Sequence, residues 1–144
     1  MTFDAQLRST LQSIHGKPSP TEARAIIDVA RLAAAADKRT DLSEAVVLLA
    51  LSRIVCEMAG LDEIPDANAS IDAARLAEIG EQLVPTGARE LAYACAFLVM
   101  VQDLDVTPEE NQLAHGLGEA LVIARPRAAE LSTQMERLVR TARG

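Results

Sequence analysis

The sequence is poor in aromatic residues, which make up 2% of its 144 residues and comprise Phe3, Tyr93 and Phe97. Domains rich in β-strands usually carry more aromatic residues and threonines than this. Hydrophobic residues nevertheless reach 49%, so the core has to be built from Ala, Leu, Val and Ile. Because alanine and leucine favour helix, and a chain of this length can bury a sizeable core, we expect an all-α fold in a single domain, residues 1–144.

Long apolar runs and an excess of positive charge are also missing. The longest apolar run, Leu91 to Val101, falls well short of the roughly 20 residues that a bilayer crossing requires. The chain carries 21 acidic and 14 basic residues, a net charge of −7, which repels phosphate backbones and anionic lipids. We therefore expect no nucleic-acid partner and no membrane insertion. The start of the chain shows no basic-then-apolar signal region, which favours a cytoplasmic location.

About seven helices are predicted from the periodicity of apolar residues and from helix breakers. Three starts carry a capping box, in which Ser19, Asp41 or Thr107 is followed three residues later by Glu. Pro126 is expected to end the sixth helix near Ala124. The first six predicted helices span approximately residues 3–14, 20–36, 42–60, 71–84, 86–102 and 108–124, and a last helix follows Pro126.

Two of the predicted helices are apolar on nearly every side. The third contains the run Val46 to Leu51, and the fifth contains the run Leu91 to Val101. A helix that is apolar all round is normally buried all round. We expect these two helices to form the centre of the fold, with the others packed outside them.

The second and third helices are similar in pattern to the fifth and sixth. In each pair an aspartate, Asp37 or Asp103, ends an aliphatic helix; a capping residue follows four positions later and a glutamate seven positions later. This pattern predicts two repeat units, residues 22–60 and 88–124, that form pseudo-twofold related helical hairpins. Chance similarity between two ordinary capped hairpins is the alternative.

These turns resemble the inter-helix turn of the TerB-like family of tellurite-resistance and stress proteins, which has the form Ala-Asp-Gly-x-Ile/Val-x-x-x-Glu in a duplicated helical hairpin. The matching segments are 36–44 and 103–110, within a resemblance that covers residues 25–124. Lys38 and Leu104 stand where the family has glycine, and Thr40 stands where it has an aliphatic residue. The resemblance implies a non-enzymatic stress-response or adaptor domain that acts with a protein partner.

The two acidic turns are candidate sites for a divalent cation. Carboxylates and free carbonyls at a helix C-terminus are the oxygen ligands that Ca²⁺ and Mg²⁺ prefer, and Zn²⁺ is a further candidate. The second turn is favoured, because residues 90–124 hold six acids and no Lys or Arg, whereas Lys38 and Arg39 can neutralise the first. The alternative is that these acids act only as helix caps and solvated charges. The candidate ligands are Asp103, Asp105 and Glu110 in the second turn and Asp37, Asp41 and Glu44 in the first.

The two cysteines raise the alternative of a small helical enzyme or redox protein that uses Cys56 or Cys95. The stretch from Glu44 to Cys56 loosely resembles the carboxymuconolactone decarboxylase/AhpD superfamily, but the position three residues after Cys56 is Ala59, so a redox pair is missing. Both cysteines lie in apolar runs, which predicts buried free thiols with a raised pKa and low reactivity.

The remaining candidates are two histidines and the last helix. His15, beside Gly16, is expected to cap a helix or to be solvated, and His115 to be a partly exposed surface residue. The last helix carries an apolar stripe that could pair between two chains, which makes a homodimer a further alternative. The stripe comprises Ala128, Leu131, Met135, Leu138 and Ala142.

Overall fold

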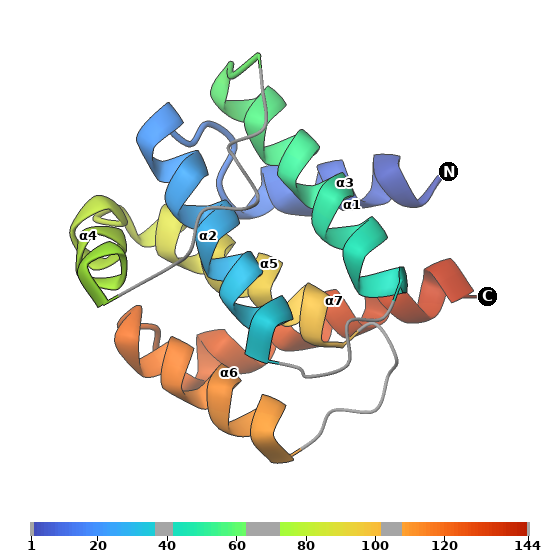
Figure 1. Ribbon diagram of the computed structural model, residues 1–144. Coiled ribbons are helices and arrows are strands. Elements are labelled where there is room, and N and C mark those ends of the chain that lie inside the picture. Colours follow the sequence, from blue (N-terminus) through green and yellow to red (C-terminus); the bar gives the residue numbers. More distant parts are fainter. Residues whose placement is uncertain (1, 37–41, 63–72, 102–107, 144) are drawn as a thin grey trace.

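A computed structural model of the chain describes residues 2–36, 42–62, 73–101 and 108–143. These ranges contain seven helices and no strand, so the prediction of an all-α fold is confirmed (Figure 1). The helices are α1 (Phe3–Ile14), α2 (Pro20–Ala36), α3 (Leu42–Ala59), α4 (Ala73–Gln82), α5 (Thr86–Met100), α6 (Pro108–Ala120) and α7 (Arg125–Arg143).

The start of α2 is fixed by the capping box that the sequence predicts. The backbone N–H of Ser19 donates to Glu22 Oε1 at 2.9 Å, and the backbone N–H of Glu22 donates to Ser19 Oγ at 3.1 Å. This reciprocal pair satisfies two N–H groups that have no partner within the helix. The boxes that begin at Asp41 and Thr107 lie outside the described residues.

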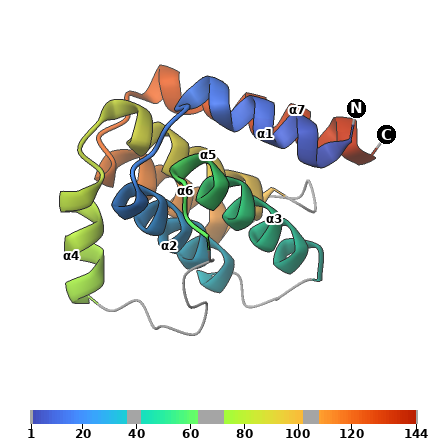
Figure 2. The same ribbon diagram turned by 90° about the horizontal axis from the view of Figure 1, so that it is seen from above.

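Helices α2 and α5 form the most extensive helix pair of the fold. Both α3 and α6 pack against each member of this pair, α4 packs on α2, and α7 packs on α5. Helix α1 lies alongside α7, so the two ends of the chain are close together (Figure 2). The pseudo-twofold relation between the two hairpins stays a prediction.

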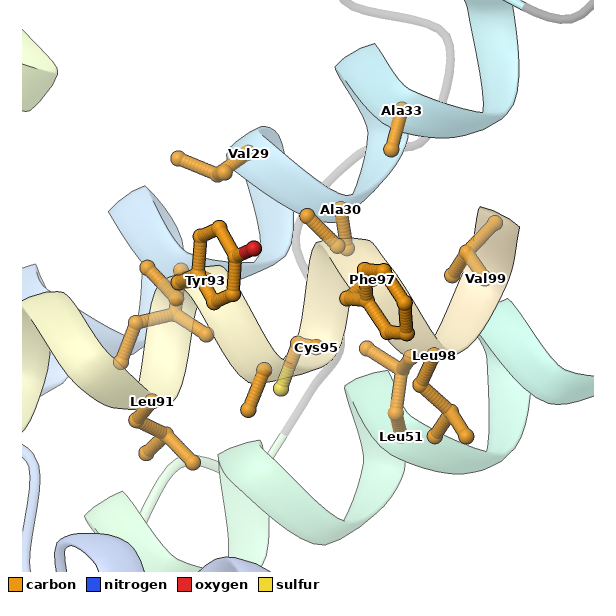
Figure 3. Close-up of a cluster of buried hydrophobic side chains, with 14 of the residues drawn as sticks. Val29, Ala30, Ala33, Leu51, Leu91, Tyr93, Cys95, Phe97, Leu98 and Val99 are labelled. Carbon is orange, nitrogen blue, oxygen red and sulfur yellow. The ribbon is translucent and has the colours of Figure 1, made fainter. Parts of the chain in front are cut away.

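Helix α5 is central, as its sequence predicts. Every residue from Leu91 to Val101 is buried, and the Tyr93 and Phe97 rings stack with their centroids 6.3 Å apart. Figure 3 shows α5 between Ala30 and Ala33 of α2 on one side and Leu51 of α3 on another. Small alanines let α2 approach α5 closely, which explains why these two helices share the largest contact. No helix in the described ranges is both long and apolar enough to cross a bilayer.

The prediction that α3 is buried all round is wrong for one of its sides. Leu51 and Ile54 lie in the core, but Val46 is 59% exposed and Leu49 is 56% exposed. The physical reason is position: α3 packs on α2, α5 and α1, and no described helix covers its outer side. Helix α2, and not α3, is the second central helix beside α5.

Helices α3 and α6 end in the same way. In α3, the N–H of Leu61 donates to the carbonyl of Cys56 at 2.8 Å while Gly60 adopts φ 75°. In α6, the N–H of Ile123 donates to the carbonyl of Gly118 at 2.9 Å while Val122 adopts φ 57°. Both are Schellman motifs, which reverse the chain through one left-handed residue. This turn ends α6 at Ala120, before the predicted Ala124.

Helix α7 begins at Arg125, with Pro126 in its first turn. Proline is tolerated there because the first N–H groups of a helix have no internal partner. The apolar stripe of α7 packs within its own chain, since Leu131 and Met135 are fully buried and Leu138 is buried. These side chains are therefore packed within their own chain, and the homodimer stays a prediction.

Candidate functional site

The side chains of the six predicted cation ligands are not among those that the structure describes. Asp37, Asp41, Asp103 and Asp105 fall between the described ranges, and Glu44 and Glu110 lie in α3 and α6 with side chains that are not described. Helices α2 and α5, which precede the two acidic turns, run in the same general direction (Figures 1 and 2). Among the described residues, no group of three His, Cys, Asp or Glu is placed to hold a metal ion. The cation site stays a prediction.

Both thiols are buried and neither forms a disulfide, as the sequence predicts. Burial raises the pKa of the Cys95 thiol to about 12. Burial also raises the pKa of Cys56, although the positive charge of Arg24 partly opposes this. A nucleophilic or redox cysteine needs an accessible thiolate near neutral pH. The placement of both residues therefore weighs against the enzyme alternative.

His15 joins three helices. Its backbone N–H donates to the carbonyl of Leu11 at 3.1 Å. His15 therefore caps α1, which is one of the two roles that the sequence predicts for it. Its side chain is only 23% exposed, so it is not a solvated histidine; Nε2 lies 3.6 Å from Glu22 Oε1 at the start of α2. The ring also lies against Gly87 in the first turn of α5, where an added Cβ would be 2.6 Å from Nδ1. His15 therefore has a structural role.

A small pocket between α5, α6 and α7 contains a histidine–glutamate pair. Its volume is about 200 Å³, and its lining includes the buried Tyr93 and the exposed His115, Glu119 and Arg125. His115 Nε2 lies 3.1 Å from Glu119 Oε1, and both side chains are more than half exposed. The expectation of an exposed His115 is confirmed. Its partner, Glu119, lies four residues later on the same helix, a spacing that the sequence itself shows.

The polar groups beneath this pocket are already satisfied. Ser132 Oγ donates to the carbonyl of Ala128 at 2.9 Å, so the hydroxyl of Tyr93, 3.1 Å from Ser132 Oγ, acts as the donor of that pair. No nucleophile is poised beside His115 in the part of the chain described. The pocket offers one exposed acid–base pair and an arginine, which is too little for a defined reaction.

Buried or half-buried arginines tie the outer helices to the central pair. Arg75 of α4 donates to Asp28 of α2 at 2.7 Å, and Arg127 of α7 donates through two nitrogens to Glu90 Oε1 of α5 at 3.0 and 2.9 Å. The hydrogen bond to Glu90 is the main cause that raises the pKa of Arg127. These ion pairs therefore stabilise the packing of α4 on α2 and of α7 on α5.

The outer side of α3 is the clearest unoccupied surface in the described structure. We call Val46, Leu49, Arg53 and Glu57 the α3 face; all four residues are exposed. Its charged half is already paired with α1, through Arg53 to Asp4 at 3.4 Å and through Glu57 to Arg8. Its apolar half is formed by Val46 and Leu49, one helical turn apart, which are not covered by any described helix.

No protein-family model, no curated protein and no solved structure matches this chain. The resemblance to TerB-like proteins therefore depends on the two acidic turns and on the order of the helices.

Proposed function

We propose that this protein is a non-enzymatic adaptor domain of a stress response, related to TerB-like tellurite-resistance proteins. It binds a protein partner through the α3 face and a divalent cation on an acidic inter-helix turn. The observation that carries the proposal is the exposure of Val46 and Leu49 on a helix whose other sides are packed.

The partner is inferred from the chemistry of the α3 face. Two large aliphatic side chains on one face are more than half exposed, and their exposure to water is unfavourable in free energy. Contact with a second protein surface would remove this unfavourable term. Their spacing of three residues matches the apolar stripe of an amphipathic helix. Because Arg53 and Glu57 already have partners in α1, the face favours apolar contact over an ion-pair interface. We therefore assign it an amphipathic helix of a partner protein.

The cation is inferred from charge. Asp103, Asp105 and Glu110 lie in a segment without Lys or Arg, where repulsion between carboxylates has no internal counter-charge. A divalent cation would relieve this repulsion and use the free carbonyls at the end of α5 as further ligands. The first turn, with Asp37, Asp41 and Glu44, is the second choice.

Thermal unfolding after EDTA treatment tests the cation, with Ca²⁺, Mg²⁺, Mn²⁺ or Zn²⁺ then added back. An ion at 100 times its dissociation constant adds about 2.7 kcal/mol, which is several degrees in Tm for a domain of this size. The Asp103→Asn/Glu110→Gln variant should lose the rise. The matched control Asp62→Asn/Glu81→Gln, which removes two exposed acids elsewhere, should keep it. If no ion raises Tm, these acids are caps and surface charge.

The partner surface is tested with Val46→Ser/Leu49→Ser. Because both side chains are exposed, stability should change by no more than about 0.5 kcal/mol each. A partner that co-purifies with the wild type should, once identified and purified, bind the wild type directly. It should not bind this variant. Val84→Ser/Val122→Ser is the matched control, since those valines are 63% and 76% exposed elsewhere on the surface. Light scattering that shows a dimer abolished by Val46→Ser/Leu49→Ser would instead assign the face to a second copy.

The stress link is tested in the source organism. A strain that lacks the gene should be more sensitive to tellurite, and the wild-type gene should restore growth while Val46→Ser/Leu49→Ser should not. Unchanged sensitivity would remove tellurite from the proposal and leave the adaptor role to be tested against other stresses.

A further inference from the structure

A groove of about 400 Å³ runs between α1 and α7, the two helices that lie side by side in Figure 2. Its volume is within the range of small-molecule sites. The residues that line it project from the side of α1 opposite to Asp4 and Arg8, which contact α3. The groove is therefore separate from the α3 face and independent of the function proposed above.

The hydroxyl groups in the groove present acceptors. Thr10 Oγ1 donates to the carbonyl of Gln6 at 2.9 Å, Ser13 Oγ donates to the carbonyl of Thr10 at 2.6 Å, and Thr141 Oγ1 donates to the carbonyl of Arg137 at 2.8 Å. Each hydroxyl hydrogen is therefore engaged with its own helix, while the oxygen lone pairs remain available. A ligand that binds these three oxygens has to supply donors, whereas Ser9 and Gln6 in the same lining can also donate.

Gln134 adds a further acceptor. Its Oε1 atom is buried and has no hydrogen-bond partner among the described residues, and the side chain lines the groove. A buried polar atom without a partner is costly, and most such atoms in folded proteins are satisfied by protein, water or ligand. Because the atom has no solvent-accessible surface where it lies, a ligand hydroxyl would satisfy it once the amide turns toward the groove.

Arg137 provides the only charge among the described residues of the lining. In the described part of the chain, no acid pairs with it and no carboxylate lines the groove, although the protein as a whole has a net charge of −7. A guanidinium in this setting selects a carboxylate or phosphate, which it can bind through two N–H groups. The absence of a lining carboxylate disfavours an ammonium group on the ligand, so its donors are neutral hydroxyls.

We propose that the α1–α7 groove binds a polyhydroxylated anion of monosaccharide size, a sugar acid or sugar phosphate. Its anionic group pairs with Arg137, and its hydroxyls donate to Gln134 Oε1 and to the oxygens of Thr10, Ser13 and Thr141.

Two-dimensional ¹H–¹⁵N NMR with four probes tests this site. The probes are glucuronate, glucose 6-phosphate, glucose, which lacks the anion, and acetate, which lacks the hydroxyls. Glucuronate or glucose 6-phosphate should shift the Gln134 side-chain amide and the Arg137 Nε–H signals in a saturable manner. Glucose and acetate should bind at least about tenfold more weakly, because each lacks one of the two recognised groups. Whichever anion binds more tightly identifies the carboxylate or the phosphate as the natural group.

Three variants separate binding from folding. Arg137→Gln should remove the preference for the anionic probes over glucose, and Thr141→Val, which preserves shape, should weaken both anionic probes. Arg140→Gln removes an equal charge from an exposed position of α7 outside the groove and should bind as the wild type does. The proposal is overturned if no probe shifts Gln134 and Arg137, if glucose binds as tightly as glucuronate, or if Arg140→Gln weakens binding as much as Arg137→Gln.

Discussion

Helix α3 ends with Gly60 in the left-handed conformation, and α6 ends in the same motif with Val122. These are the second helices of the two hairpins that the sequence pattern relates. The shared ending shows that the same backbone turn was built with two different residues. Glycine adopts this conformation without steric cost, whereas a β-branched residue is strained there. Backbone geometry is therefore alike at the two ends, but the second hairpin stores strain that the first does not.

The two most apolar helices differ in how far they are buried, although the two hairpins place the same member at the centre. Helix α5 is enclosed along Leu91 to Val101, while the equally apolar α3 leaves Val46 and Leu49 in water. In the first hairpin it is α2, the helix before the turn, that packs at the centre; in the second it is α5, again the helix before the turn. Position in the hairpin, more than the number of apolar residues, decides which helix is central.

The largest effect should come from shortening one leucine in each apolar helix. Leu91→Ala opens a cavity in α5 and should lower the free energy of unfolding by about 2–5 kcal/mol. Leu49→Ala removes a side chain that is 56% exposed and should cost less than about 0.5 kcal/mol. Urea denaturation of both variants measures the difference. Equal losses would mean that α3 is as enclosed as α5.

A smaller effect should separate the two thiols at high pH. The Cys95 thiol has its pKa raised from the ordinary 9.0 to about 12 by burial, so the folded state holds its proton when the unfolded chain has lost it. Its stabilising contribution is complete below about pH 9 and is lost as pH rises toward 12. From pH 9 to about 10.5, the wild type should lose about 1.5 kcal/mol more than Cys95→Ala does.

Cys56→Ala is the comparison for that experiment. The pKa of Cys56 is also raised by burial, but Arg24 opposes the rise, so its pH-dependent loss should be smaller than that of Cys95. Urea denaturation across this pH range gives both values. A parallel pH profile for wild type and Cys95→Ala would show that Cys95 is not enclosed.

The smallest effect should come from exchanging the residues at the two helix ends. Val122→Gly relieves the strain of the left-handed conformation but raises the conformational entropy of the unfolded chain. We expect the free energy of unfolding to rise by about 0.5–1 kcal/mol. Gly60→Val introduces the same strain into α3 and should lower stability by about 1–2 kcal/mol. Thermal unfolding should show Tm rising for the first variant and falling for the second. A fall in Tm for Val122→Gly would mean that the valine side chain contributes contacts that outweigh its strain.

Local signals in the sequence account for most helix positions. Ser19 and Glu22 form the predicted capping box, and α1 occupies the predicted residues 3–14. The predicted end of α6 is wrong because nothing in the sequence indicates that Val122 adopts the left-handed conformation that glycine favours. The role of His15 could not be inferred either, since its neighbour Gly87 lies 72 positions away along the chain and meets it only through the packing of α5.

The candidate sites divide in the same way. The burial of Cys56 and Cys95 follows from the apolar runs around them, and the structure confirms it. The α1–α7 groove brings Gln6 together with Gln134 from opposite ends of the chain, so no spacing in the sequence could indicate it.

The sequence by itself determined the helices and the all-α class, because propensity, periodicity and capping are local and act within about one turn of each residue. It also determined that both thiols would be buried, since each lies in an apolar run. Only the tertiary structure decided that α2 and not α3 joins α5 at the centre, that the α7 stripe is buried in its own chain, and that α1 and α7 enclose a polar groove. Those outcomes depend on which helix faces compete for the same core, and that competition is settled by packing between residues far apart in the chain.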